Sequence, residues 1–311
     1  MEAIVYLGGI MTAEIILSNP SPFEPSFINQ VLSNMDVSTK TRADYQFRLG
    51  RFKAFCLQHG MNRNTILEYK RSLAADNTIS VATKNKYLIV ARCYVQQLFR
   101  LGLITVDIGA GIKGFRVGTA WNMRGFTGAE VKRIIVGLNA STDIRLKAIL
   151  SLQMFAGFRC CEITRLMVEH VSLTDAFIQV LGKGRDGLEN LPLVPQVVQV
   201  LKDYLNATKK KSGFLFTSQS KRNHGSGMTT KSIWLIVRQF LDSLGIHRNP
   251  HQCRSFYVSQ LVKGPLGNNL FNVIQLTRHA SIQTLQSYVD MKDRENMLPS
   301  YEQSFSDFKI S

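Results

Sequence analysis

The sequence reads HQCR at residues 251–254 and TRHASIQTLQSY at residues 277–288. His251 and Arg254 are three positions apart, so a helix through them places both side chains on one face. A second histidine and, nine positions later, Tyr288 follow in the second stretch. An imidazole, a guanidinium and a phenol together suit an anionic electrophile such as a phosphodiester, with the tyrosine as nucleophile. The rest of the chain is then expected to supply further cationic groups and the contacts that bind the substrate.

The chain is strongly basic and, on the usual size of domains, long enough for about two of them. It has 311 residues, and the 45% that are apolar supply material for sizeable cores. Lys and Arg number 38 against 22 Asp and Glu, which gives a formal net charge of +16 and a pI of about 9.8. This surplus favours a polyanionic partner, nucleic acid before membrane. Because the chain has no apolar run of about 18 residues, we expect no membrane span.

The opening of the chain and its cysteines favour a cytoplasmic protein, and the expected nucleic-acid partner makes it nucleoid-associated. Residues 1–17 are apolar but contain Glu2 and Glu14 and no basic region, so a signal peptide is not indicated, and both Met1 and Met11 are candidate starts. The five cysteines are odd in number and have neither a CxxC pattern nor zinc-finger spacing, which is typical of reduced thiols. We therefore expect no metal and no other cofactor.

A helical domain is predicted over residues 26–104, after a proline-containing lead-in over 1–25. Helices are expected over residues 38–60, 65–75 and 81–101. The two long ones each combine an apolar stripe with basic residues on the other faces. A basic face is usually only solvated, but two such faces in one small unit favour DNA contact. The candidates for DNA contact are Lys40, Arg42, Arg48, Arg51, Lys84, Lys86 and Arg92.

Residues 105–125 predict an interdomain linker, because they are rich in glycine and basic residues and lack periodicity. Lys113 and Arg116 of this segment are further candidates for contact with a phosphate backbone.

Residues 126–311 predict a domain that is mainly α with a small antiparallel β-sheet. Thr127 and Glu130 form a capping-box pattern before the first helix of this domain. Further helices are expected over residues 143–155, 195–207 and 229–244. Between the helices expected over 143–155 and 195–207 the period becomes strand-like, and residues 176–181 and 188–195 predict two strands that flank GKGRDG.

Two basic residues of this domain have both a functional and a structural explanation. Gly157 suits a tight turn between helices, and Arg159 follows it at a helix start, where the helix dipole disfavours a cation. A bound phosphate would remove that conflict, and a salt bridge to Glu162 would do so equally well. Lys183 is expected at a hairpin tip, where most lysines are merely solvated.

Four stretches occur in a fixed order: AGFRCCEITRL (156–166), LGKG (181–184), HQCR (251–254) and TRHASIQTLQSY (277–288). With this order and spacing, and with the helical domain before them, the chain resembles the tyrosine recombinase family, also called phage integrases. The resemblance implies that a core-binding domain of SAM-like fold and the catalytic domain form a C-shaped clamp around duplex DNA. It also implies site-specific cleavage and rejoining of DNA without metal or ATP.

The resemblance also assigns roles to individual residues. Arg159 and Arg254 match the arginines that hold the non-bridging oxygens of the scissile phosphate, and Glu162 matches a supporting acid that orients an arginine. Tyr288 matches the nucleophile, which forms a 3′-phosphotyrosyl link and frees a 5′-hydroxyl. His251 matches the residue that assists proton transfer at the tyrosine.

The two remaining catalytic positions match Lys183, expected to protonate the leaving 5′-oxygen, and His279, expected to hydrogen-bond the phosphate. The chain departs from the family at Thr277 and Arg278, where Leu-Gly is usual, and at Ser255, where His is frequent. Arg278 either binds DNA or loosens the close approach that glycine permits. No departure removes a reacting group, so we expect an active enzyme.

The family parallel implies a homotetramer on two paired double-stranded DNA sites. The tail carries Tyr301, Phe305 and Phe308, which either pack on their own domain or dock into a neighbouring protomer. Two alternatives stay open. A type IB-like topoisomerase shares the covalent chemistry, and an inert DNA-binding relative keeps only the fold. The two-domain size favours the recombinase over the first alternative, and the filled catalytic positions argue against the second.

Overall fold

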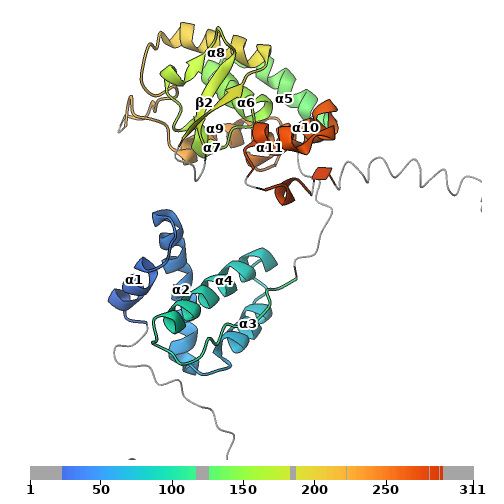
Figure 1. Cartoon of the computed structure of the whole chain (residues 1–311). Helices are drawn as coiled ribbons and strands as arrows, with labels where there is room; N and C mark the ends of the chain where they lie inside the picture. The colour runs from blue at the N-terminus through green and yellow to red at the C-terminus, as the bar shows by residue number, and fades with distance from the viewer. Residues whose placement is uncertain are drawn as a thin grey trace, which may run out of the picture. The chain divides into compact units, whose positions relative to one another are not determined.

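The computed structural model divides the chain into two compact units, Met1–Ala120 and Trp121–Ser311. The residues that the structure describes are 23–116, 126–182, 187–221, 223–279, 281–286 and 288–289. Each unit has its own apolar core and its own set of helices (Figure 1). The boundary between the units falls inside the segment 105–125 that the sequence predicts as a linker.

The first unit is helical. Its helices are α1 (Pro25–Ser33), α2 (Thr39–His59), α3 (Thr65–Ala75) and α4 (Val81–Arg100). Helix α2 packs on the other three, and the buried rings of Phe52, Tyr69 and Tyr94 fill the core between them. Ser38 and Ser80 cap α2 and α4, because their side chains accept the N–H groups of Thr41 and Thr83. The predictions for α2, α3 and α4 are therefore confirmed.

Two parts of this unit were not predicted. Helix α1 lies where no helix is expected from the sequence, and it buries Ile28, Val31 and Leu32 in the core. Beyond α4, Ile108 is buried in the same core, and the Asn85 side chain donates to the Phe115 carbonyl at 3.0 Å and accepts its N–H at 2.7 Å. The chain up to this point thus packs on the helical unit.

Among its described residues, the second unit combines α-helices, two short 3-10 helices and a small sheet. The α-helices are α5 (Gly128–Ala140), α6 (Ile144–Phe155), α7 (Cys160–Ile163), α8 (Pro195–Thr208), α9 (Thr230–Ser243), α10 (His251–Lys263) and α11 (Leu270–Thr277). Two short 3-10 helices are η1 (Val168–His170) and η2 (Pro265–Asn268). Helix α6 contacts α8, α9 and α10 and is buried on nearly all sides, so it forms the centre of the unit (Figure 1).

The sheet has the order β1-β2-β3 and is antiparallel throughout. Its strands are β1 (Val171–Ser172), β2 (Phe177–Leu181) and β3 (Leu188–Pro192). Ile178 lies opposite Leu191, and both side chains are buried in the core. The two predicted strands are present, and the short β1 was not predicted.

The predicted class, mainly α with a small antiparallel sheet, is confirmed. The capping box of α5 is present as well, since Thr127 and Glu130 satisfy each other's backbone N–H. Helix α11 was not predicted. Among the described residues, no helix combines the length and apolar character that a membrane span requires.

Candidate active site

The loop between α6 and α7 turns at Gly157, whose φ is +65°. A β-carbon there would overlap the ring of Tyr257 on α10, and the left-handed conformation itself favours glycine. The tight turn predicted from the sequence is therefore present, and a side chain is excluded. The Gly157 carbonyl accepts hydrogen bonds from two guanidinium groups, those of Arg254 and Arg278.

Arg159 follows this turn at the N-terminus of α7 and is bound to Glu162. The Glu162 carboxylate accepts the backbone N–H of Arg159 at 2.8 Å and its Nη1 at 2.6 Å. The salt bridge considered from the sequence is thus formed. The Glu162 side chain has no exposed surface, whereas the Arg159 side chain is 23% exposed. A buried carboxylate therefore anchors a guanidinium that reaches solvent.

The Glu162 carboxylate stays ionised in spite of its burial. Burial raises its pKa, but Arg278, the backbone N–H of Arg159, and the charges of Arg159 and Arg254 lower it by more. The net pKa of Glu162 lies below the ordinary value. The carboxylate is therefore a fixed negative charge beneath a group of arginines.

Arg254 lies in the first turn of α10 and is only 3% exposed. Its two terminal nitrogens donate to the carbonyls of Gly157 and Thr277. Burial, then the charges of Arg159 and Arg278, lower its pKa to about 9, so it remains a cation at neutral pH. It ties α10 to the turn at Gly157, which precedes Arg159, and to the end of α11, which precedes His279.

The two histidines are held as neutral bases at neutral pH. Burial and then the nearby arginines Arg254, Arg159 and Arg278 lower the pKa of His279 to about 4. Partial burial, then Arg254 and Arg159, lower the pKa of His251. The Nδ1 atom of His279 lies 2.9 Å from the Thr277 hydroxyl, which fixes the imidazole ring. Thr277 was not predicted as part of the site.

Tyr288 lies in a helical turn and is partly buried against Val258, Val262, Val273 and Leu285. It interacts electrostatically with Arg254. The predicted nucleophile therefore lies within electrostatic range of the predicted phosphate-binding arginine, although all of α11 separates the two in the chain.

Comparison with known sequences shows which family the chain belongs to. The model of the phage integrase family matches residues 124–295. The chain belongs to this family. A tyrosine recombinase of Synechococcus elongatus is 28% identical over 235 residues, which are 73% of this chain and 72% of that protein. The tyrosine recombinase XerA of Pyrococcus horikoshii is 28% identical over 53% of this chain, and the match spans about half of that protein, 56% of its length.

Solved structures of the phage integrase family share the fold. The XerH recombinase in a post-cleavage complex with its difH substrate has a TM-score of 0.69 and 17% identity, over 91% of this chain and 84% of that one. A lambda integrase tetramer on a Holliday junction has a TM-score of 0.65 and 13% identity, over 85% of this chain and 75% of that one. The predicted family and enzyme class, a tyrosine site-specific recombinase, are thus confirmed.

One family position cannot be placed. Lys183 lies outside the described residues, between β2 and β3. The tail residues Tyr301, Phe305 and Phe308 also lie outside them. Their predicted roles remain predictions.

Arg278 is not presented at the surface, which corrects its interpretation as a DNA contact. The residue is 5% exposed, and its guanidinium donates to Glu162 at 2.9 Å and to the Gly157 carbonyl at 3.1 Å. The departure from the Leu-Gly that is usual before this histidine was visible in the sequence. The inward direction of the side chain was not.

Some of the predicted DNA-contacting residues of the first unit are bound within the protein, and the others are exposed. Lys84 is 8% exposed, and its ammonium donates to the Ala74 carbonyl at 2.8 Å, so it serves the fold and not a DNA surface. The partly buried arginines are bound within the protein to carboxylates or carbonyls, namely Arg42, Arg48, Arg51 and Arg92. The exposed members of the set are Lys40, Lys86, Lys113 and Arg116.

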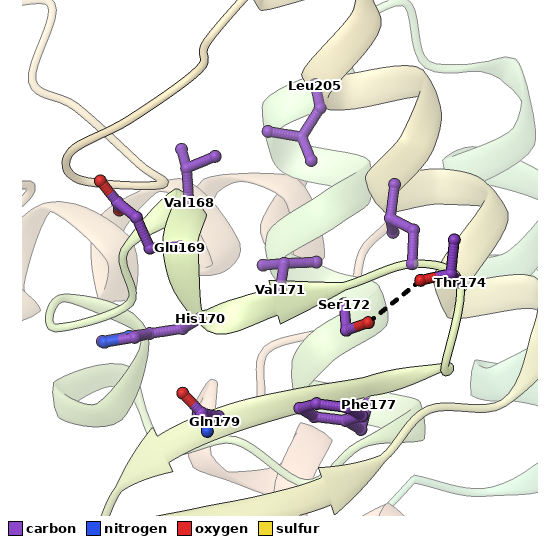
Figure 2. A pocket seen from close by; sticks show the side chains of 10 residues that line it. Val168, Glu169, His170, Val171, Ser172, Thr174, Phe177, Gln179 and Leu205 are labelled. Atoms are coloured by element: carbon purple, nitrogen blue, oxygen red, sulfur yellow. Dashed lines mark hydrogen bonds between the residues drawn. The ribbon is translucent and has the colours of Figure 1, made fainter.

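A separate cavity of about 500 Å³ lies beside η1, β1 and β2, with Leu205 of α8 on its far side (Figure 2). The Glu169 carboxylate accepts the Gly213 N–H at 3.0 Å, and His170 Nδ1 accepts the Met167 N–H at 3.1 Å. The described members of the predicted catalytic set do not line this cavity. Its polar groups support neighbouring turns, and we assign it no part in the site.

Proposed function

We propose that this chain is a site-specific DNA recombinase that cuts and rejoins strands through a 3′-phosphotyrosyl intermediate on Tyr288. The observation that carries the proposal is the convergence of Arg159 and Arg254 on one buried framework with His251, His279 and Tyr288 around it. Such a set of cations and neutral imidazoles beside a phenol suits in-line attack on a phosphodiester.

The arginines would stabilise the charge that develops during attack. A phosphodiester gains negative charge on its non-bridging oxygens in the transition state, and donors that are already in place lower its energy without reorganisation. Arg159 and Arg254 are such donors, because both are fixed by Glu162 or by backbone carbonyls before any substrate binds. His279, held by Thr277, would add a neutral donor.

Proton transfer would use His251 as the base and Lys183 as the acid. A phenol has a pKa near 10 in water and reacts faster when a base accepts its proton. Because the pKa of His251 is lowered, its imidazole is neutral at pH 7 and available as that base. Lys183 would protonate the 5′-oxygen as it leaves.

The proposed exchange is balanced in bonds and needs no ATP or metal. The tyrosine oxygen forms a bond to phosphorus as the bond to the 5′-oxygen breaks, and the later attack of a 5′-hydroxyl reverses the step on a new partner. One phosphodiester replaces another at each step. Integration, excision and resolution of DNA all use this chemistry, and the proposal includes each of them.

We further propose that the protein works as a homotetramer on two double-stranded sites in the nucleoid. The exposed Lys40, Lys86, Lys113 and Arg116 would contribute to holding the phosphate backbone. The tail with Phe305 and Phe308 would dock into a neighbouring protomer. Truncation after Pro299 should then weaken assembly of paired sites, and a truncated chain that assembles as well as the full chain would contradict this point.

The experiment for the main proposal is covalent trapping on nicked duplexes made from the DNA that flanks the gene. We expect an SDS-stable protein–DNA adduct with the wild-type chain and none with Tyr288→Phe. The Tyr288→Phe variant should still shift the same duplex in a gel, since only the hydroxyl is removed. Wild-type protein that binds the duplex without forming an adduct would favour an inert DNA-binding relative.

A further inference from the structure

Arg278 occupies a backbone conformation that normally selects glycine. It is the residue after α11 and has φ +55° and ψ +42°. Left-handed backbone is unfavourable for a residue with a β-carbon, and glycine is the usual solution at a helix C-terminus. Strain of this kind persists where surrounding contacts hold the residue in place. The contacts made by the Arg278 side chain therefore call for an explanation.

The side chain folds back beneath the predicted phosphate site. Its Nη2 donates to the Glu162 carboxylate at 2.9 Å and to the Gly157 carbonyl at 3.1 Å, and its Nη1 donates to the Leu276 carbonyl at 3.2 Å. The guanidinium carbon lies 5.0 Å from the centre of the Phe158 ring. Only 1% of the side chain is exposed, and its guanidinium is directed at the carboxylate of Glu162.

The two main partners of Arg278 are also partners of the two phosphate-binding arginines. Glu162 is shared with Arg159, and the Gly157 carbonyl is shared with Arg254. We propose that Arg278 is a positioning residue for strand cleavage, which acts through Glu162 and Gly157 to hold Arg159 and Arg254 in their reactive arrangement. This inference rests on the proposed function.

The charge balance explains why a third arginine helps. Three guanidinium groups, those of Arg159, Arg254 and Arg278, surround one carboxylate, that of Glu162. Arg278 occupies Oε2 of that carboxylate, and Arg159 binds Oε1 through Nη1. Without Arg278, more of the negative charge of Glu162 would act on Arg159 and weaken the attraction of Arg159 for a phosphate. Arg278 thus leaves the site with more positive potential than a glycine at this position would.

The test compares Arg278→Met, Arg278→Lys and Arg278→Gly with the wild-type chain in single-turnover cleavage of a nicked duplex from the flanking DNA. We expect Arg278→Met to cleave about 100-fold more slowly, because the arginines that stabilise the transition state are no longer held in place. Its DNA affinity should stay within about threefold of wild type, since Arg278 itself does not contact the DNA. Arg278→Lys should recover part of the rate. Arg278→Gly relieves the backbone strain, so it should fold well and still cleave slowly.

A double-mutant cycle with Glu162→Gln separates positioning from general damage. If Arg278 acts through Glu162, the double variant should be about as slow as the slower single variant. Full multiplication of the two losses, or an Arg278→Met rate within about twofold of wild type, would overturn the inference while the recombinase proposal stood. If the wild-type chain itself forms no adduct, the recombinase proposal fails, and this inference fails with it.

Discussion

The arginines of the two units differ in how they find their partners. In the helical unit Arg48 pairs with Asp44 one turn away at 2.8 Å, one cation to one carboxylate, with the carboxylate 49% exposed. In the catalytic unit Arg159 and Arg278 come from separate elements and share one wholly buried carboxylate, that of Glu162. The charge of Arg254, from a third element, acts on the same carboxylate. The first arrangement neutralises charge at the surface. The second concentrates positive charge at one place, which is what binding of a phosphate requires.

The largest expected effect separates these two kinds of arginine. Arg254→Met should reduce strand cleavage by about 1,000-fold, because it removes a donor that no other group replaces. It should also lower the melting temperature, since the carbonyls of Gly157 and Thr277 lose their buried donor. Arg48→Met is the matched control, and it should leave both the rate and the melting temperature nearly unchanged. Equal losses of cleavage rate in the two variants would contradict the distinction between the two kinds of arginine.

A smaller effect concerns the pH dependence of stability. In the folded protein burial and then the nearby arginines lower the pKa of His279 to about 4, against about 6.5 in an unfolded chain. Between these values the unfolded chain binds the additional proton, so this residue lowers the free energy of unfolding as pH falls from about 6.5 to 4. We expect His279→Gln to lose less stability than wild type between pH 7 and pH 5 in urea titrations. His247→Gln, which changes a 75% exposed imidazole, serves as the control.

The smallest expected effect contrasts two lysines of α4. Lys86 is exposed and Lys84 is buried with its ammonium on the Ala74 carbonyl. Lys86→Gln should weaken DNA binding a few-fold and reduce the slope of log affinity against log salt by about 1, with no change in melting temperature. Lys84→Met should lower the melting temperature and leave that slope unchanged. The opposite pattern would mean that exposure does not identify the DNA-facing residues.

Much of the fold is encoded in local pattern. The ends of α2, α3 and α4 follow from serine caps, an apolar stripe and Gly60, and Gly157 follows from the need for a turn between α6 and α7. These features depend on neighbours within a few residues, so the sequence alone contains them. The same is true of the capping box at Thr127.

The direction of buried polar side chains is not encoded locally. Arg278 and Lys84 have the spacing of surface residues, yet each is drawn inward by an acceptor on another element, Glu162 for the first and the end of α3 for the second. Helix α1 was missed for a related reason, because its stability comes from packing on α2 and α4. Order and spacing of the motifs predicted the members of the site. The shared carboxylate that organises them required the structure.

The most direct test of the account is to identify the residue that carries the DNA. The chain has nine tyrosines, and Tyr257 also lies close to Arg254 and Arg278. After trapping on a nicked duplex and digestion, peptide mass spectrometry should find the nucleotide remnant on Tyr288 alone, linked through the 3′-phosphate. A remnant on Tyr257 or another residue, or a 5′-phosphate link, would contradict the assigned nucleophile and the mechanism built on it.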